Sequence, residues 1–468
     1  MKVRPLIAAA TAALVIVPAA QAMAAGWKRV TAPGGTSIDQ VSPLRTADGV
    51  LHLAWHLRTG PNTEDILHTV LAPNGALGAT TPIVSGWASL QNPALVAVPE
   101  GIRAFFGGIR TTSPDETLLE LNTAVSGDGG ATWAAATGPV VPPGAQAYGS
   151  PVSAATLPNG TTLQAWAGTL GTWVHAGLDP ATPNHDLQAP LGQYGYDVGT
   201  AVDAAGRAVV AWYSSGAGRL GVFAQDVAAD GSPVGSAVNM PGTAAMKVGM
   251  LGRTPIVARP GGGFYVAYAT GYPALNTVRV WRVGTGAAPV VGRPNRNGNS
   301  TATIAAGADG RLWVVWTDTT RGTRVLARRS NRTAGIFGAT VDAGRPAGAA
   351  SGYRLDASAA GGALDVLGLF STGTSSNAAT WHRRILPGLT LTATPRTVRR
   401  DRATTVRFTV LDAGDPVRGA RVTVGGASGT TKANGRVELT IPGGSQPASA
   451  RATAAGYTPT AIGVRRVR

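Results

Sequence analysis

The sequence predicts an all-β protein: a β-propeller of seven blades, with six as the alternative, followed by a smaller C-terminal β-sandwich. The main observation is a pattern that recurs along most of the chain. An apolar strand, often with an early Pro, leads through a Gly turn to a second apolar strand that ends near an aromatic residue, and a third strand follows. Units of roughly 40 to 50 residues built from several short strands are typical of propellers. No long amphipathic helix pattern accompanies them.

Seven copies of this pattern keep the same internal order. They span residues 42–56, 92–106, 150–166, 199–213, 254–269, 301–316 and 355–370. Their turn glycines, spaced 46 to 59 residues apart, are Gly49, Gly101, Gly160, Gly206, Gly263, Gly310 and Gly362. A series of β-sandwiches is the alternative, but it would not repeat one order seven times. The segment 26–30 is expected to add a strand that closes the ring, and the propeller is expected to occupy residues 26–386.

The N-terminus, residues 1–25, has the pattern of a signal peptide. Lys2 and Arg4 precede an apolar run over residues 6–17, and small residues around Ala22 and Ala24 follow. The run is too short to cross a membrane, and no later segment reaches that length. We therefore expect a secreted, extracellular bacterial protein without a transmembrane segment.

Residues 388–468 have a different sequence pattern from the repeats. Short alternating strands with Gly and Pro turns fit an immunoglobulin-like (Ig-like) β-sandwich. The segments 415–422, 431–435 and 454–457 resemble bacterial Ig-like or carboxypeptidase-regulatory-like modules. That resemblance implies a spacer or an adhesive accessory.

The charge of the chain indicates an anionic partner. The net charge is +16, and residues 388–468 hold 13 Lys and Arg against 4 acids. The abundance of Ala, Gly and Arg gives a compositional explanation, whereas the functional one is attraction to a glycan or an anionic cell-envelope polymer. Another protein is a further possible partner, but no motif for specific nucleic-acid recognition is present. The absence of Cys excludes disulfides, Cys-ligated metals and thiol nucleophiles.

One short stretch carries a specific motif. Residues 126–133 read SGDGGATW, in which Ser and Asp side chains are placed to bind turn amides and Trp to pack back on the hairpin. The pattern S-x-D-x-G-x-T-W resembles the Asp-box, or BNR repeat, of sialidase-like β-propellers. Its fixed positions are Ser126, Asp128, Gly130, Thr132 and Trp133. In that family the box is a structural turn opposite the active site, which implies that Asp128 is not catalytic.

The resemblance to sialidases extends over residues 91–133. It implies Asp115 as the general acid/base and Arg110 as its neighbouring cation, and Glu116 is the alternative member of an ordinary two-carboxylate glycosidase pair. Gln91 stands where the family has an arginine for the substrate carboxylate, and an amide cannot replace that charge-assisted pair.

Sialidases also use a Tyr nucleophile that a Glu makes reactive. The chain has no Glu between Glu120 and Glu438. Three aspartates remain as possible substitutes: Asp197, Asp318 and Asp356.

The preferred function is therefore binding without catalysis. Loops on the face opposite the Asp-box are expected to bind a glycan through aromatic and Arg side chains. The predicted binding residues are Trp87, Tyr148, Tyr194, Tyr196, Arg296, Tyr353 and Arg354. The basic C-terminal module would act as a spacer or envelope anchor, and an exo-sialidase-like glycoside hydrolase is the alternative.

Three histidines raise the question of a metal. His52 and His56 share one face of a predicted strand, and His68 is expected across from Ala54 on the same face if residues 57–65 form the hairpin loop. Three imidazoles would suit zinc or copper. The ordinary interpretation is a polar face between blades with satisfied histidines, and we predict no metal and no cofactor.

Overall fold

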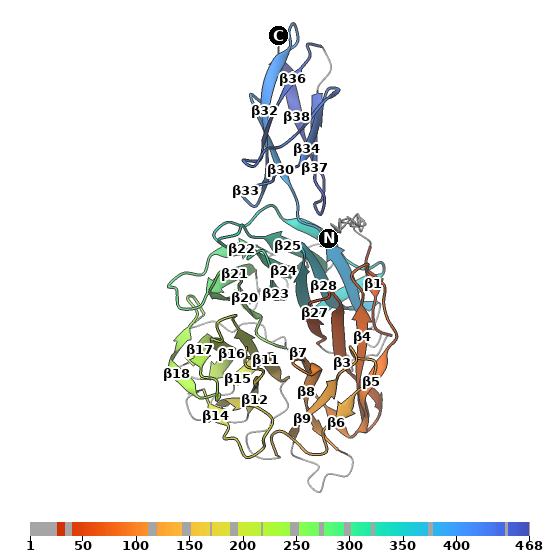
Figure 1. Cartoon of the computed structure of the whole chain (residues 1–468), viewed down its shortest axis with the longest axis vertical. Coiled ribbons are helices and arrows are strands. Elements are labelled where there is room, and N and C mark those ends of the chain that lie inside the picture. Colours follow the sequence, from red (N-terminus) through yellow and green to blue (C-terminus); the bar gives the residue numbers. More distant parts are fainter. Residues whose placement is uncertain are drawn as a thin grey trace, which may run out of the picture.

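The computed structural model describes residues 26–32, 40–110, 119–142, 151–168, 171–187, 195–216, 219–243, 252–270, 276–293, 301–319, 323–372, 378–444 and 448–467. These residues form strands and connecting turns, and none of them lies in a helix, so no helix among them is able to cross a membrane. The fold is all-β, as the sequence predicts. A ring of sheets carries a smaller protruding part at its rim (Figure 1).

Within the described residues, the chain up to Ile385 forms seven antiparallel sheets. The first holds β2 (Ser42–Arg45), β3 (Leu51–Gly60), β4 (Thr63–Leu71) and β5 (Thr81–Trp87). The second holds β6 (Ser89–Leu90), β7 (Ala94–Val98), β8 (Gly101–Ile109), β9 (Glu120–Ser126) and β10 (Ala134–Ala135). The third holds β11 (Ser153–Thr156), β12 (Thr162–Gly168), β13 (Gly171–Ala176) and β14 (His185–Asp186).

The remaining sheets follow the same order. The fourth holds β15 (Gly195–Val202), β16 (Ala208–Gly216), β17 (Arg219–Val227) and β18 (Pro233–Asn239). The fifth holds β19 (Ile256–Ala258), β20 (Phe264–Thr270), β21 (Thr277–Arg282) and β22 (Val290–Gly292). The sixth holds β23 (Ala302–Ala306), β24 (Leu312–Asp318), β25 (Arg324–Arg329) and β26 (Val341–Gly344). The seventh holds β27 (Ala349–Ala360), β28 (Ala363–Thr372), β29 (Ala378–Ile385) and β1 (Lys28–Arg29).

The ring closes in two ways. Strand β1 pairs with β29, with Lys28 opposite His382, so the N-terminal segment completes the last sheet. The leading strands of the sheets also contact one another in a closed order: β2, β7, β11, β15, β19, β23, β27 and again β2. These leading strands surround the axis of the ring (Figure 1).

Neighbouring sheets bury apolar side chains against each other. Between the third and fourth sheets the buried cluster includes Leu163, Val174, Val210 and Trp212. Residues that alternate with these along the strands, such as Trp166, point to the other face and pack against the second sheet, so that each sheet packs on both neighbours. Burying this surface stabilises the ring without disulfides.

The ring has two faces with different construction. The turn face carries the connections from first to second strand and from third to fourth strand of each sheet. The opposite face, where the leading strands begin, is called the mouth face here because it surrounds the entrance to the axis. Residues 126–133 connect β9 to β10 and therefore lie on the turn face.

The Ser126–Trp133 turn is held by its own side chains. The Ser126 hydroxyl accepts a hydrogen bond from the Gly130 amide at 2.8 Å and donates one to Asp128 at 2.7 Å. Asp128 also accepts from the amide and the hydroxyl of Thr132, at 2.9 and 2.6 Å. These bonds lower the pKa of Asp128 below its ordinary value, Thr132 contributing most.

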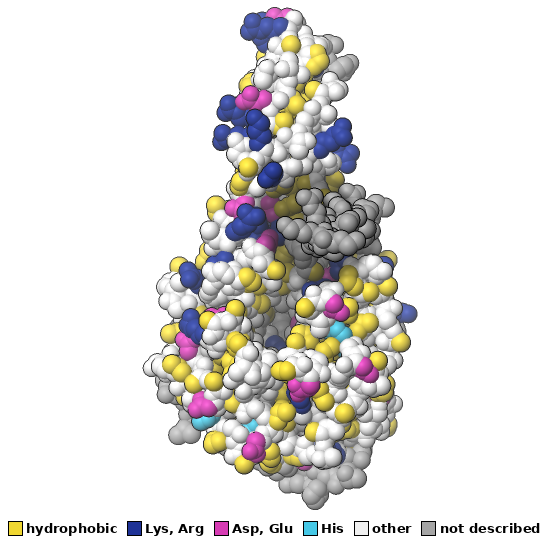
Figure 2. All heavy atoms as spheres, viewed as in Figure 1, with side chains coloured by type: hydrophobic (Ala, Val, Ile, Leu, Met, Phe, Trp, Pro, Cys, Tyr) yellow, Lys and Arg dark blue, Asp and Glu magenta, His cyan; other side chains and the backbone are white. Residues whose placement is uncertain are grey.

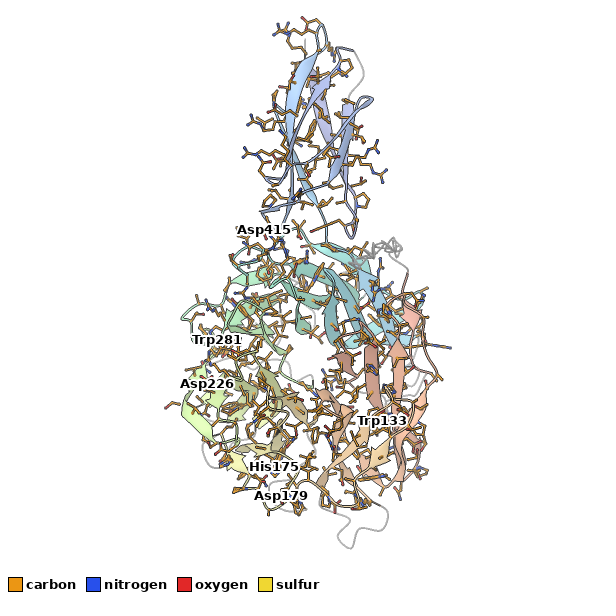
Figure 3. The ribbon with its side chains drawn as sticks, in the orientation of Figure 1. Trp133, His175, Asp179, Asp226, Trp281 and Asp415 are labelled. Carbon is orange, nitrogen blue, oxygen red and sulfur yellow. The ribbon has the colours of Figure 1, made fainter. Side chains whose placement is uncertain are left out.

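Trp133 reaches beyond its own sheet. Its ring meets the His68 ring of the first sheet edge-on, with 5.3 Å between centroids. It joins an apolar cluster shared by the first and second sheets, and Figure 3 shows it among the strands of these two sheets. The turn thus connects two neighbouring sheets.

The C-terminal part is a sandwich of two sheets. One contains β30 (Thr390–Thr394), β32 (Thr404–Asp412), β33 (Asp415–Pro416) and β36 (Arg436–Ile441). The other contains β31 (Thr397–Arg399), β38 (Thr460–Val467), β37 (Ala448–Thr453), β34 (Arg421–Val424) and β35 (Ala427–Thr430). Apolar side chains of both sheets form one buried core, in which Phe408 and Val422 are fully enclosed.

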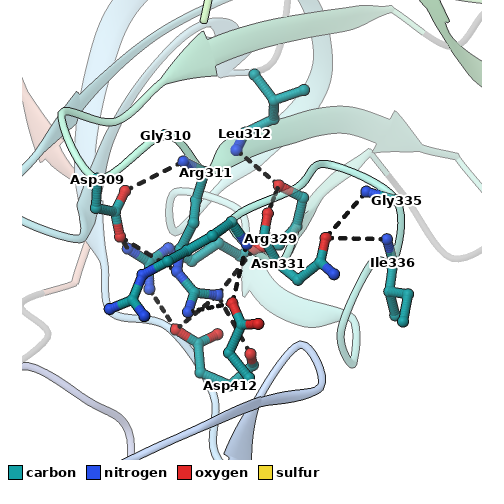
Figure 4. Close-up of polar contacts among 12 residues, drawn as sticks. Asp309, Gly310, Arg311, Leu312, Arg329, Asn331, Gly335, Ile336 and Asp412 are labelled. Atoms are coloured by element: carbon teal, nitrogen blue, oxygen red, sulfur yellow. Dashed lines mark hydrogen bonds and ion pairs between the residues drawn. The ribbon is translucent and has the colours of Figure 1, made fainter. Parts of the chain in front are cut away.

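A buried ionic cluster joins the sandwich to the sixth sheet (Figure 4). Arg311 and Arg329 of the ring are 4% and 6% exposed, and Asp412 of the sandwich is 2% exposed. Arg329 pairs with both Asp412 and Asp309, and Arg311 pairs with Asp415 at 2.6 Å. Figure 3 shows Asp415 at the base of the sandwich, toward the ring. The sandwich is therefore held to the turn face by charges that are mutually compensated.

Candidate binding site at the mouth of the ring

The entrance to the axis is spanned by the segment that leads into β19. The Arg253 guanidinium donates from Nε to the Val152 carbonyl at 2.9 Å and from Nη2 to the Asn92 carbonyl at 3.3 Å. The same Nη2 also donates to the Pro93 carbonyl. Arg253 thus connects the fifth sheet to the starts of the second and third.

Two carboxylates are hydrogen-bonded, directly or through Gln40, to this segment, residues 252–254. Asp197 of β15 accepts a hydrogen bond from the Gly252 amide at 3.0 Å, and its carbonyl accepts from the Thr254 amide at 2.5 Å. Asp356 of β27 accepts from the Gln40 side-chain amide at 2.9 Å, and the Gln40 oxygen accepts from the Arg253 amide at 2.9 Å. One hydrogen-bonded network thereby joins residues of the first, fourth, fifth and seventh sheets.

Local backbone features bring these groups together. The pairing of β15 with β16 shifts between Tyr196 and Gly199, and within this bulge Asp197 has a φ of +52°. A bulge re-aims a side chain, and positive φ is uncommon for a non-Gly residue. The mouth face therefore holds Asp197 in a conformation that ordinary strand geometry would not give.

Two glycines permit the close approach of backbones at this point. A Cβ on Gly199 would lie 1.9 Å from the Thr254 carbonyl oxygen. A Cβ on Gly252, whose φ is +112°, would lie 2.1 Å from the Gln40 side-chain oxygen. The network requires glycine at both positions.

A cavity of about 210 Å³ follows the axis beneath this network and is lined by leading strands of all seven sheets. Its polar lining includes Ser42, Ser153, Thr200, Arg253, Thr303 and Asp356. A neighbouring cavity reaches between the fourth and fifth sheets, where Tyr213 and Tyr268 line it with Asp197. A concave site on which several polar groups converge is the first candidate for a ligand site.

Tyr268 is not activated for nucleophilic chemistry. Its hydroxyl donates to the Pro241 carbonyl at 3.1 Å, and the side chain is 4% exposed. Burial raises the pKa of Tyr268 to about 12, although the positive charge of Arg279 acts in the opposite direction. A raised pKa disfavours the phenolate that a Tyr nucleophile needs.

Arg110 and Trp87 lie together at the rim rather than at the axis. The Arg110 guanidinium stacks over the Trp87 ring, 5.1 Å from its centroid, and donates to Asn122 at 2.9 Å. Trp87 also meets Phe106 edge-on at 5.4 Å. Trp87 ends β5 instead of lying in a link between sheets, and it packs against Phe106 and Arg110; its role in sugar binding stays a prediction.

A second polar cluster at this rim was not predicted from the sequence. Glu64, 3% exposed, accepts from His56 at 2.9 Å, from Arg58 at 3.0 Å and from the Leu90 amide at 2.5 Å. Its carboxylate therefore holds the Leu90 amide at the end of β6 and is engaged by three donors from the first and second sheets.

The three histidines do not converge, because His56 is turned to Glu64. The hairpin is tighter than expected, with β3 reaching Gly60 and β4 starting at Thr63, and His68 does oppose Ala54. His52 and His68 lie 3.1 Å apart between ring nitrogens. The part of the chain that the structure describes holds no cluster of three potential ligands for a metal.

Several predicted site residues fall outside the described residues: the signal peptide 1–25, Asp115, Glu116, Tyr148, Tyr194 and Arg296. Tyr196 and Tyr353 belong to β15 and β27, but their side chains are outside the description. Arg354 lies on β27, next to Asp356, and is half-buried.

Of the three substitute aspartates, Asp197 and Asp356 reach the mouth, whereas Asp318 pairs with Arg324 at 3.0 Å. Gln40 and Arg253 were missed altogether. A signal was available: a polar residue and Pro lie at or just before the start of leading strands at Ser42, Asn92 and Thr254, and Gln40 and Arg253 directly or nearly precede two of these pairs.

No protein-family model and no curated protein sequence matches the chain. Among solved structures, an ulvan lyase, a polysaccharide lyase PL25 bound to -[GlcA(1-4)Rha3S]-, aligns with a TM-score of 0.50 at 12% identity over 76% of this chain and 94% of that chain. The ring is a β-propeller. At this identity the likeness establishes the fold alone.

Two further structures resemble the propeller. A protein of unknown function from Dyadobacter fermentans DSM 18053 aligns with a TM-score of 0.48 at 12% identity, over 77% of this chain and 98% of that one. An alpha-L-arabinofuranosidase from Clostridium thermocellum ATCC 27405 aligns with a TM-score of 0.33 at 16% identity, over 54% of this chain and 94% of that one.

Proposed function

We propose that this chain is a secreted, seven-bladed propeller that binds a glycan at its mouth face without cleaving it. In this proposal each of the seven sheets is one blade, the Ser126–Trp133 turn is an Asp-box of the sialidase type, and residues 388–468 are an Ig-like spacer or envelope anchor. The observation that carries the binding role is the Asp197–Gln40–Asp356 network around Arg253, placed over an axial cavity lined by leading strands of every sheet.

The network suits sugar hydroxyls. Carboxylate oxygens accept charge-assisted hydrogen bonds, which are stronger than those between neutral groups. Asp197 and Asp356 each accept a bond from a protein amide, which fixes the orientation of the carboxylate before a ligand arrives. A carboxylate has about four acceptor sites, so one carboxylate can accept several hydrogen bonds at once.

Three features favour binding over hydrolysis. Tyr268 has a raised pKa and donates to a backbone carbonyl, the opposite of a Tyr nucleophile. Both mouth carboxylates take part in bonds that hold the Gly252–Thr254 segment. Arg110, implied as the partner of an Asp115 acid, is engaged by Trp87 and Asn122. The alternative is a sialidase-like glycoside hydrolase that uses Asp115 as acid/base.

A glycan array probed with the purified full chain tests the proposal, and every bound glycan is also checked for shortened products. Asp356→Asn preserves the acceptor for Gln40 and removes the charge, and we expect it to weaken binding about tenfold because a charge-assisted bond becomes a neutral one. Asp342→Asn, at an exposed position of the sixth sheet, is the matched control and should bind like the wild type.

The hydrolase alternative has its own variant. Asp115→Ala should leave binding unchanged if the protein only binds glycans. Shortened product from the wild type that disappears with Asp115→Ala would establish the hydrolase instead. Equal affinity of the wild type and Asp356→Asn would remove the mouth from the binding site.

A further inference from the structure

The four acidic side chains of the sandwich are all paired with arginines. Asp412 and Asp415 are directed to Arg329 and Arg311 in the joint with the ring. Asp401 pairs with Arg399 at 2.8 Å, and Glu438 pairs with Arg407 at 3.1 Å. These four are the acids of residues 388–468, which hold 13 Lys and Arg, so most of the basic side chains face solvent without a carboxylate from the sandwich.

Part of the unpaired positive charge lies on one sheet of the sandwich. On the five-stranded sheet, the outward side chains include Arg421 of β34, Arg451 of β37 and Arg465 of β38, all exposed. They share one face because Arg451 opposes Thr423 and Ala461, and residues two apart along a strand point the same way. No ion pair within the described residues engages these three. We call this surface the arginine face.

The arginine face has few groups that could bind a partner in another way. Its strands contain neither an acid nor an aromatic residue, and the side chains between the arginines are small ones such as Thr423, Ser449, Ala461 and Gly463. Bases and sugar rings commonly stack on aromatic side chains, and helices that insert into a membrane surface carry large apolar ones, neither of which the arginine face offers. Charge is therefore the property by which this face can recognise a partner.

The spacing of the arginines fits an extended chain of charges. From strand geometry, Arg421 and Arg451 lie diagonally about 8 Å apart, and Arg465 lies about 14 Å from Arg451 on the next strand. Guanidinium groups pair with phosphate in a bidentate manner. Figure 2 shows Lys and Arg side chains concentrated on the protruding sandwich, which the ionic joint holds away from the ring.

We infer that the arginine face docks a linear cell-wall polymer of the poly(polyol phosphate) class. The inference rests on the proposed role of the sandwich as an envelope anchor and identifies its surface and its ligand. A polymer with one phosphate in each short polyol unit engages the three arginines together, so its affinity exceeds that of a single unit. Each paired phosphate releases counterions, which makes the affinity fall steeply with salt.

The probe is soluble poly(glycerol phosphate), titrated into the full chain at several salt concentrations. The substitution of Arg421, Arg451 and Arg465 by Gln should weaken the binding of poly(glycerol phosphate) about tenfold, because three exposed ion pairs with phosphate are lost. The affinity of this variant should also depend less steeply on salt. The matched control replaces Arg407, Lys432 and Arg436 by Gln, which removes the same charge outside the arginine face. This control should change the affinity less than about threefold, since only non-specific attraction is lost.

One further arm separates the two sources of phosphate, a polymer and a lipid surface. Vesicles that contain phosphatidylglycerol offer the same headgroup chemistry on a lipid surface and should bind more weakly than the polymer. Equal weakening by both triple variants, an unchanged affinity of the arginine-face variant, or tighter binding to vesicles would overturn the inference. Thermal melts confirm that both variants are folded, and the glycan array reports on the mouth separately, so either proposal can fail alone.

Discussion

The two faces of the propeller are built from different kinds of contact. On the turn face, the Ser126–Trp133 turn is closed by hydrogen bonds between residues two and four positions apart in sequence. On the mouth face, Arg253 bonds to Gln40 across 213 positions, and Gln40 bonds to Asp356 across 316. The turn forms from its own eight residues, whereas the mouth network exists only when the ring has closed.

This difference predicts how the faces respond to substitution. A change in the local turn removes a few exposed hydrogen bonds. A change at the mouth disturbs the packing of several sheets at once, so its effect on stability and on ligand binding should be greater.

The largest effect is expected for Gly199→Ala. The new Cβ would lie 1.9 Å from the Thr254 carbonyl oxygen, and a backbone atom in a closed ring has little room to withdraw. We expect a loss of about 3 to 4 kcal/mol in the free energy of unfolding, measured by urea denaturation. Gly286→Ala, where a Cβ meets nothing within 4 Å, is the control and should be near neutral. A similar midpoint for both variants would contradict the close approach at the mouth.

The joint with the sandwich is an exception on the turn face, because its contacts are long-range and buried. Asp412→Ala leaves Arg329 and Arg311 without the most buried carboxylate of the cluster. We expect a loss of about 3 kcal/mol, as for other buried pairs that are broken from one side. Calorimetry should show the sandwich transition at a lower temperature, and Asp401→Ala, an exposed pair, should leave it in place. Identical melts for the two variants would show that the joint does not stabilise the sandwich.

The same distinction explains what the sequence could predict. The repeated strands and the Ser126–Trp133 turn are encoded within windows of ten to twenty residues, so the all-β ring and the closing segment at Lys28 were predictable. Gln40 and Arg253 are marked in the sequence only by their position before a polar residue and Pro, and the contact between them is set by ring closure. Trp87 was mistaken for a loop residue because the end of β5 cannot be distinguished from a link by composition.

A third prediction concerns His68, which joins the turn to the first sheet. Burial, assisted by the nearby His52, lowers the pKa of His68 to about 4. The unfolded state, with an ordinary pKa near 6.5, therefore binds the proton first, and stability is lost as the pH falls from 6.5 toward 4. This linkage amounts to about 2 kcal/mol between pH 7 and pH 5.

The test is His68→Gln, compared with the wild type by urea denaturation at both pH values. The variant should lack that part of the pH dependence, and His185→Gln on the third sheet should retain it. An unchanged pH dependence in His68→Gln would mean that the ring of His68 is not buried as described.

The smallest effect is expected for Asp128→Asn, which keeps the shape of the turn and removes its charge. Hydrogen bonds from Thr132 and Ser126 lower the pKa of Asp128, so its contribution to stability is present above the unfolded value near 4 and is lost as the pH falls toward the folded value. The melting temperature of the variant should be slightly below that of the wild type at pH 7, and the gap should close in acid. Glycan binding should be unchanged, because the turn lies on the face opposite the mouth. A variant that melts like the wild type at pH 7 but loses glycan binding would place the ligand on the turn face and reverse the roles assigned to the two faces.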